Sequence, residues 1–305
     1  MDQERTEPQG PRTKDREFAV PRVDAHQHFW KYDALEYGWI DDAMAGLRRD
    51  FLPADAEREM RRAGFDACVA VQARQTIQET RWLLSLAESH SFIAGVVGWF
   101  DLQAPDVRVG LEQLAGHPKL VGVRHIVQTE ADDRFLLRPE FGRGIALLEE
   151  FGLAYDLLVY SRHLPVATEF AGRFAGQRLV LDHLAKPEVR RGEIRAWSAD
   201  VRKLAACPNV WCKLSGLVTE ADWAAWKPEQ LWPYLDVAFD CFGVDRLMIG
   251  SDWPVCTVAS DYARTMAAVV EYLADRPARE RDAVLGGNAQ RFWNLDMVGG
   301  SGDRA

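Results

Sequence analysis

Short apolar runs rich in Val, Ile and Leu recur along the whole chain, and charged amphipathic stretches lie between them. Such runs predict strands that are buried on both faces, as in a parallel sheet. We expect eight strands, near residues 21–26, 67–72, 93–99, 120–125, 154–159, 178–183, 210–215 and 246–251. Helices are expected between and after them, at 53–63, 79–89, 106–116, 143–151, 165–176, 194–206, 229–242 and 262–274. Eight strand and helix repeats are the number that closes an α/β, (β/α)8 TIM barrel.

A doubly wound open sheet is the competing architecture, but no Gly-rich phosphate loop follows the first apolar run. The length of 305 residues and the hydrophobic content of 48% suit one barrel of ordinary size. We therefore expect a single barrel domain over 20–298. The charged, Pro- and Gly-containing residues 1–19 lack the apolar stretch of a secretory signal and are expected to form a disordered leader, and 299–305 a flexible tail.

The composition argues against two classes of partner. A formal charge of -9 is unsuited to phosphate backbones, so nucleic acid is not an expected partner. Nothing approaches the roughly 20 apolar residues that cross a bilayer, so no membrane partner is expected. The five cysteines form no CxxC pair, which fits reduced thiols in a cytoplasmic protein. The sequence favours no particular oligomeric state.

The segment VDAHQHFW ends the first apolar run with His26 and His28. On an extended strand these two side chains lie on one face, so both imidazoles can reach one metal ion or one substrate atom. The alternative is that they are ordinary core or solvated histidines. Because polar residues repeatedly follow the predicted strands, at the end where parallel β/α folds build their catalytic sites, we favour a site at the barrel mouth.

Two further strand ends supply the remaining candidates for catalysis. The run LVLDHLAKP places His183 at the sixth strand end, and LMIGSDWPVC places Asp252 at the eighth. Asp252 is expected to act as a general base that takes a proton from the attacking water, with or without binding a metal through the same carboxylate. The alternatives are a helix-capping role for Asp252 and a supporting role for His183. Asp182 is expected to point away from the site, because neighbouring strand residues face opposite sides.

Other residues near the strand ends are candidates for substrate contacts: Gln72, Arg124, His125, Lys186, Lys213, Ser215 and Trp30. Only one of the adjacent pair Arg124 and His125 should face the mouth, where a guanidinium can hold a carboxylate or a ring oxygen. Lys213 and Ser215 share a face and suit hydroxyls or a developing oxyanion. Structural ion pairs, a surface lysine and core packing of the indole are the alternatives.

In this order, the motifs VDAHQHFW, GVRHIVQ, LVLDHLAKP, CKLSGLVTEADW and LMIGSDWPVC resemble the sugar-lactonase branch of the amidohydrolase superfamily, which includes L-fuconolactonases and L-rhamnonolactonases. The likeness spans about residues 20–295. It implies a barrel of the amidohydrolase type and a hydrolase that opens a sugar aldonolactone, most closely L-fucono-1,5-lactone. It also places the site on His26, His28, His183 and Asp252, with a small sugar lactone as the partner.

The sequence departs from the superfamily pattern in its metal ligands. Many members hold two metals with a lysine from the fourth strand and a histidine from the fifth. Here the fourth run ends in Arg124 and His125, and the run 154–159 contains neither residue type. We therefore expect at most one divalent ion, with zinc favoured, on the His26, His28, His183 and Asp252 group, or a metal-independent enzyme. A metal-dependent decarboxylase of the same superfamily and a sugar-acid binding protein are the rival functions.

Overall fold

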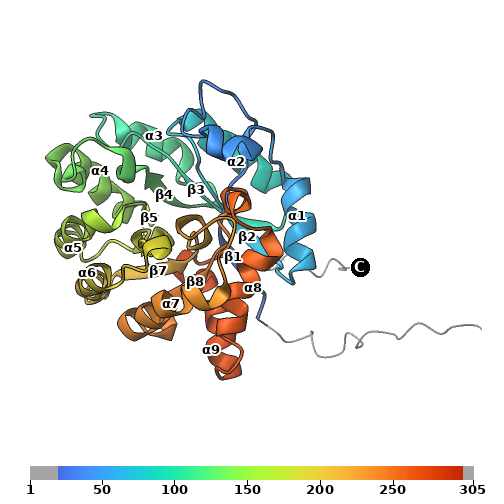
Figure 1. The fold of residues 1–305 in the computed structure, drawn as a ribbon. Helices are drawn as coiled ribbons and strands as arrows, with labels where there is room; N and C mark the ends of the chain where they lie inside the picture. The colour runs from blue at the N-terminus through green and yellow to red at the C-terminus, as the bar shows by residue number, and fades with distance from the viewer. Residues whose placement is uncertain (1–19, 298–305) are drawn as a thin grey trace, which may run out of the picture.

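The computed structural model describes residues 20–297, and within them eight parallel strands pair in the order β1 to β8 (Figure 1). The strands are β1 (Val23–Gln27), β2 (Ala67–Val71), β3 (Ile93–Gly98), β4 (Leu120–His125), β5 (Ala154–Leu157), β6 (Leu179–Leu181), β7 (Val210–Leu214) and β8 (Leu247–Ile249). The predicted (β/α)8 barrel is therefore confirmed. The predicted leader 1–19 and tail 299–305 lie outside the described residues.

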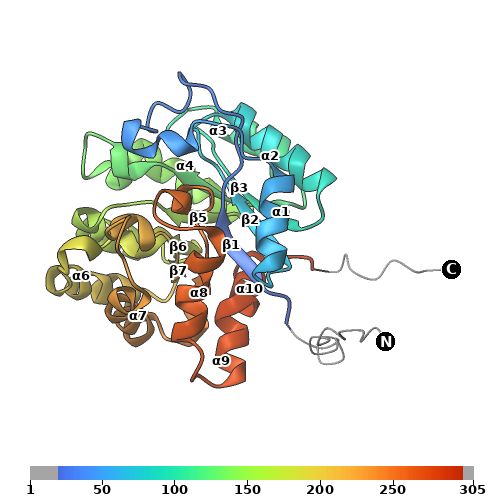
Figure 2. The same ribbon diagram turned by 45° about the vertical axis from the view of Figure 1, so that its right-hand side comes forward.

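The helices form a ring around these strands (Figure 1). They are α1 (Pro53–Arg62), α2 (Ile77–Ser89), α3 (Val107–Leu114), α4 (Pro139–Glu150), α5 (Leu164–Arg173), α6 (Arg195–Ala205), α7 (Pro228–Phe242), α8 (Tyr262–Tyr272), α9 (Ala278–Asp282) and α10 (Asn288–Trp293). A helix occupies each of the eight predicted places, and α9 and α10 are additional. Figure 2 shows α10 close to β1, where it closes one end of the barrel.

Each strand sends alternate side chains in two directions. Outward residues such as Leu179 and Leu181 join the large core beneath the helices. Inward residues such as Val69 and Val180 form a small core that Phe292 and Trp293 of α10 cover. The strands are buried on both faces, which explains why their sequences are continuous apolar runs.

The barrel closes where β8 meets β1. The Asp252 amide donates to the His26 carbonyl at 2.9 Å, and the His28 amide donates to the Trp253 carbonyl at 2.7 Å. The Ser251 hydroxyl donates to the buried Asp24 carboxylate at 2.6 Å and adds a side-chain link. These contacts bring the two ends of the domain together, although more than two hundred residues separate them.

Three strands end two residues earlier than predicted, and the first is β5, which ends at Leu157 rather than near 159. β6 ends at Leu181 rather than near 183, and β8 ends at Ile249 rather than near 251. In both places the chain turns through residues with positive φ, at His183 and Asp252, which cannot continue a strand.

Two general expectations can be compared with the described residues. None of their helices is long and apolar enough to cross a membrane. All five cysteines lie within residues 20–297 and are free thiols, as the spacing predicted.

Candidate active site

The end of β1 delivers two imidazoles to the barrel mouth. The pairing with β2 runs from Asp24 opposite Cys68 to Gln27 opposite Ala70, so two β1 residues oppose one β2 residue. This bulge bends the strand and lets His26 point inward although Ala25 also joins the inner core. His28 follows on the same side, and its Nε2 lies 3.1 Å from Nε2 of His26.

The hydrogen bonds of these imidazoles indicate which nitrogen faces the site. Nδ1 of His28 lies 2.8 Å from the Val71 carbonyl, and a carbonyl only accepts, so Nδ1 carries the proton and Nε2 presents a lone pair. Nδ1 of His26 lies 3.4 Å from Oδ1 of Asp182. The Lys213 ammonium also lies 3.2 Å from this Nδ1, and Arg124 lies 3.2 Å from Nε2, so both nitrogens of the His26 ring have polar partners.

The chain after β6 forms an unusual left-handed turn. Residues 183–186 all have positive φ between 51° and 58°, and none is glycine. Such backbone costs roughly 1–2 kcal/mol for each L-residue and is retained where the surroundings hold it firmly. The turn directs His183 into the site, where its Nδ1 lies 2.8 Å from the Ser215 hydroxyl.

The expectation that Asp182 points away from the site is wrong. Along β6 the outward residues are Leu179 and Leu181, so Asp182 is the inward position, and Arg124 donates to it at 2.9 Å. His183 reaches the same side because the left-handed turn breaks the strand alternation after Asp182. Asp182 and His183 therefore both point to the same side, toward the candidate site.

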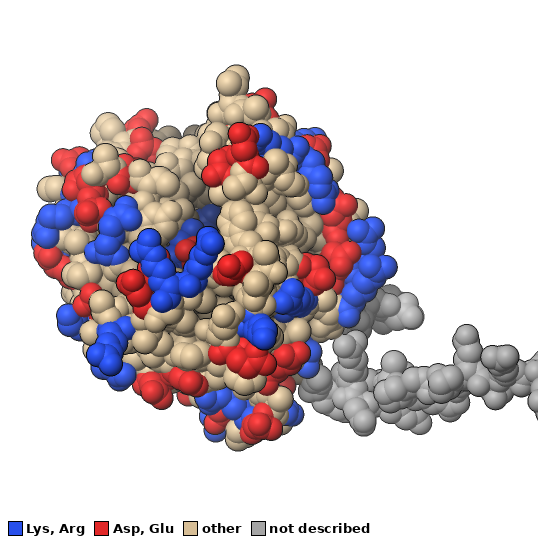
Figure 3. Space-filling view, in the orientation of Figure 1, with Lys and Arg blue, Asp and Glu red and all other residues tan. Residues whose placement is uncertain are grey.

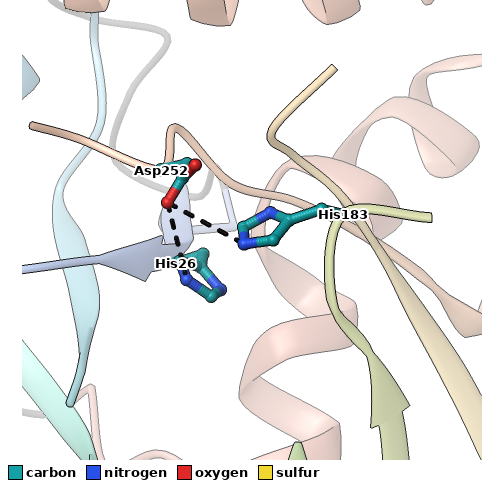
Figure 4. A group of neighbouring side chains, drawn as sticks. All are labelled: His26, His183 and Asp252. Carbon is teal, nitrogen blue, oxygen red and sulfur yellow. Dashed lines mark ion pairs between the residues drawn. The ribbon is translucent and has the colours of Figure 1, made fainter. Parts of the chain in front are cut away.

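Asp252 lies at the centre of the candidate site. Its Oδ1 is 3.3 Å from Nε2 of His28, and 3.8 Å from Nε2 of both His26 and His183. Figure 4 shows His26, on β1, and His183, on the turn after β6, both directed at this carboxylate. The space-filling view has a hollow in this face of the molecule, with acidic and basic atoms visible inside it (Figure 3). The predicted catalytic residues thus meet in one place, with a carboxylate of 6% side-chain exposure.

A layer of buried charges lies below the imidazoles. Lys213 is fully buried and donates to Asp156 at 2.5 Å, with Asp182 at 3.0 Å and Nδ1 of His26 at 3.2 Å. Arg124 donates to Asp182, to Nε2 of His26 and to the Gln72 carbonyl. Two cations and two carboxylates are therefore balanced beneath His26, and Lys213 also lies over the Trp293 ring.

The surroundings set the charge of the site groups. Burial lowers the pKa of His183 to about 4 and also holds the pKa of His26 below its usual range. Burial would raise the pKa of Asp252, but the imidazoles of His183 and His28 outweigh it, and the net shift is downward. At neutral pH His26 and His183 are therefore neutral while the carboxylate is charged, as metal ligands and a general base require.

The donor set fits a zinc ion. His26, His183 and Asp252 each offer a ligand atom, and these atoms lie within 4.8 Å of one another. Tetrahedral zinc with bonds of about 2.0–2.1 Å separates its ligand atoms by about 3.4 Å, close to the 3.1 to 3.8 Å found around Asp252 and His26. The carboxylate of Asp182 behind His26 is the kind of partner that orients metal-binding histidines.

The predicted substrate contacts divide into three groups, and the first is Arg124 and Lys213, which lie in the buried layer of charges described above. Gln72 and Ser215 lie beside the cluster, since the Gln72 amide donates to the Arg124 carbonyl and Ser215 contacts His183. Lys186 ends the left-handed turn, with its ammonium 5.5 Å from the centre of the Tyr160 ring.

His125 and Trp30 are placed apart from the cluster. The His125 ring stacks on Phe135 and contacts Glu130 at 2.7 Å. Trp30 is fully buried and donates its indole N–H to the Arg49 carbonyl. Neither side chain hydrogen-bonds to or stacks on any of the four catalytic candidates, and both pack against other aromatic rings.

Sequence reasoning missed Asp156 and Asp182 as members of the site. Asp156 lies in the middle of the apolar run AYDLLV, where a buried charge needs a partner. That isolated carboxylate, together with Lys213 in the run VWCKL, was the available signal for an ion pair inside the barrel.

The barrel and its mouth define a hydrolase whose site combines imidazoles with one carboxylate at the carboxyl ends of the strands. The model of the amidohydrolase family matches residues 23–295. The chain belongs to this family.

The chain is similar to two proteins named as L-fucono-1,5-lactonases and to a crystal structure of an amidohydrolase. The chain is 44% identical to an L-fucono-1,5-lactonase of Burkholderia multivorans, over 90% of this chain and 96% of that protein. It is 41% identical to an L-fucono-1,5-lactonase of Burkholderia ambifaria, over 92% of this chain and 97% of that protein. A crystal structure of an amidohydrolase from Burkholderia multivorans with bound zinc superposes with a TM-score of 0.88 at 43% identity, covering 90% of this chain and all of that one.

Proposed function

We propose that this enzyme hydrolyses a sugar aldonolactone, L-fucono-1,5-lactone or a close stereochemical relative, to the open-chain aldonic acid. The observation that carries the proposal is the meeting of three imidazoles with Asp252 at the barrel mouth, in a chain more than 40% identical to two L-fucono-1,5-lactonases.

A zinc ion held by His26, His28, His183 and Asp252 would act as a Lewis acid on the lactone carbonyl. The chain's own groups prepare for this role. Nδ1 of His28 donates to the Val71 carbonyl at 2.8 Å, so the ring presents Nε2 to the site. Its lone pair suits a metal better than direct contact with the carbonyl oxygen.

Asp252 moves the proton in this proposal. All three imidazole contacts of the carboxylate run through Oδ1, so Oδ2 is assigned to the water. Water adds its oxygen to the lactone carbonyl carbon as Oδ2 takes one proton. The bond from that carbon to the ring oxygen then breaks, and Asp252 returns the proton to the departing oxygen, which becomes a hydroxyl.

The buried charges below the imidazoles orient the site residues and do not react with the substrate. Lys213 is fully buried and directed at Asp156, Asp182 and His26, so we assign it to orienting His26. The same reasoning assigns Arg124 to holding Asp182 and His26. We assign contact with the substrate to Lys186, which is half-buried at the end of the turn.

The test is to assay the purified protein on a panel of sugar lactones with a pH indicator, with metal analysis of the same sample. We expect acid release from L-fucono-1,5-lactone above the spontaneous rate and about one zinc ion per chain. A protein that opens no lactone in the panel, or that instead releases carbon dioxide from a carboxylated substrate, would overturn the proposal.

A further inference from the structure

The left-handed turn after β6 is held by two side chains that no other step of the mechanism uses. Leu184 and Ala185 are fully buried, so their backbone carbonyls need hydrogen-bond partners inside the protein. Trp197 of α6 donates its indole N–H to the Leu184 carbonyl at 2.7 Å. Ser161 contacts the carbonyls of Ala185 and Lys186 at 2.9 and 3.1 Å.

Every carbonyl of the four positive-φ residues is thereby accounted for, because the Lys186 amide donates to the remaining one, on His183, at 2.8 Å. A right-handed turn would point these carbonyls elsewhere and break the contacts to Trp197 and Ser161. Side chains whose hydrogen bonds form only with the left-handed backbone can stabilise this strained conformation in a functional site.

We propose that Trp197 and Ser161 are positioning residues that hold this turn left-handed and so aim His183 at Asp252. The Nε2 atom of His183 stands 3.8 Å from Oδ1 of Asp252 only because the turn reverses the side on which residue 183 emerges. The Trp197 ring is 5% exposed and packs on Tyr234, so it is a fixed donor rather than a mobile one.

The inference rests on the proposed lactonase function for its kinetic readout alone. The variant W197F removes the indole N–H and keeps an aromatic ring. Its matched control is W226F, because Trp226 is equally buried and donates its indole N–H to a backbone carbonyl, that of Ala259, at 2.9 Å. For Ser161, S161A removes the hydroxyl and S161T keeps one.

Three measurements test the proposal. In long-range nitrogen–proton spectra, W197F and S161A should shift the His183 imidazole signal, assigned with H183N, and W226F should leave it in place. Zinc affinity and kcat/KM should each fall about tenfold in W197F, with KM little changed, and S161T should retain most of the activity lost in S161A. Placed in an H183N background, W197F should change kcat/KM by less than twofold.

The outcomes separate the two ideas. An unmoved His183 signal in both W197F and S161A overturns the positioning role whether or not any lactone is hydrolysed. An equal loss from W197F with and without His183 also overturns it, since the tryptophan would then act on general stability. A wild-type protein that opens no lactone while W197F still moves the His183 signal overturns the proposed function and leaves the positioning role supported.

Discussion

The two edges of the barrel mouth that carry histidines are built in different ways. At the β1 edge, His26 and His28 extend from a bulged strand, and buried carboxylates such as Asp24 and Glu79 tie neighbouring segments together. At the β6 edge, His183 sits on a left-handed turn that neutral donors hold. The first edge should therefore respond to pH, while the second should respond to backbone geometry.

Asp252 is the group that both edges serve, and its replacement should have the largest effect. We expect D252N to lower kcat by about 1000-fold, because the amide cannot take the proton from water. Its unfolding temperature should stay within a few degrees of the wild-type value. A D252N enzyme with near wild-type turnover would remove the general base from the mechanism and leave the two edges without a common target.

Glu79 should make the stability of the β1 edge depend on pH. Its carboxylate accepts the amides of Ala73 and Arg74 and contacts Tyr37 in the segment after β1. Burial raises its pKa to about 7 from an ordinary 4.5. The unfolded chain therefore loses this proton at lower pH than the folded chain, and the folded state loses up to about 3 kcal/mol of stability as pH rises from about 4.5 to about 7.

The measurement is denaturant unfolding at pH 5 and pH 8. The free energy of unfolding should differ less between the two pH values in E79Q than in the wild type. In E112Q, a variant at an exposed position on α3, the difference should match that of the wild type. If the free energy of unfolding of E79Q differs between pH 5 and pH 8 as much as that of the wild type, the β1 edge is no more sensitive to pH than the turn.

His28 tests whether the β1 edge supplies two metal ligands or one. We expect H28Q to weaken zinc binding about 100-fold, measured by competition with a chelator, because the Nε2 lone pair disappears. The matched control is H125Q, since His125 is buried near the mouth but contacts Glu130 and Phe135. Equal zinc affinity in H28Q and the wild type would assign the metal to His26, His183 and Asp252 alone.

The smallest effect concerns the space beside the turn. A Cβ on Gly216 would lie 2.6 Å from the His183 ring, at a φ of +66°, so G216A should lower kcat/KM about tenfold and stability by about 1–2 kcal/mol. In G152A the φ is similar, +68°, but the new Cβ meets nothing within 4 Å. G152A should therefore lose stability without losing kcat/KM, and a matching kinetic loss would contradict the geometric sensitivity of the β6 edge.

The sequence predicted the barrel because buried parallel strands leave a clear signal, eight apolar runs at regular intervals. It also indicated His26, His28, His183 and Asp252, since polar residues that end such runs meet at one edge of the sheet. Asp182 is missed because strand alternation, extended to His183, puts these two neighbours on opposite sides, whereas the backbone changes hand after Asp182. That change depends on Trp197 and Ser161, which lie elsewhere in the chain, so local rules could not reveal it.

The balanced charges beneath His26 have a consequence for redesign of this enzyme. Removing any one of these four groups would leave a buried charge without its partner and would cost about 3–5 kcal/mol of stability. The groups are Arg124, Asp156, Asp182 and Lys213. Laboratory evolution toward other lactones should therefore leave these four positions untouched, or exchange them in pairs, and find its adaptive changes in the loops above.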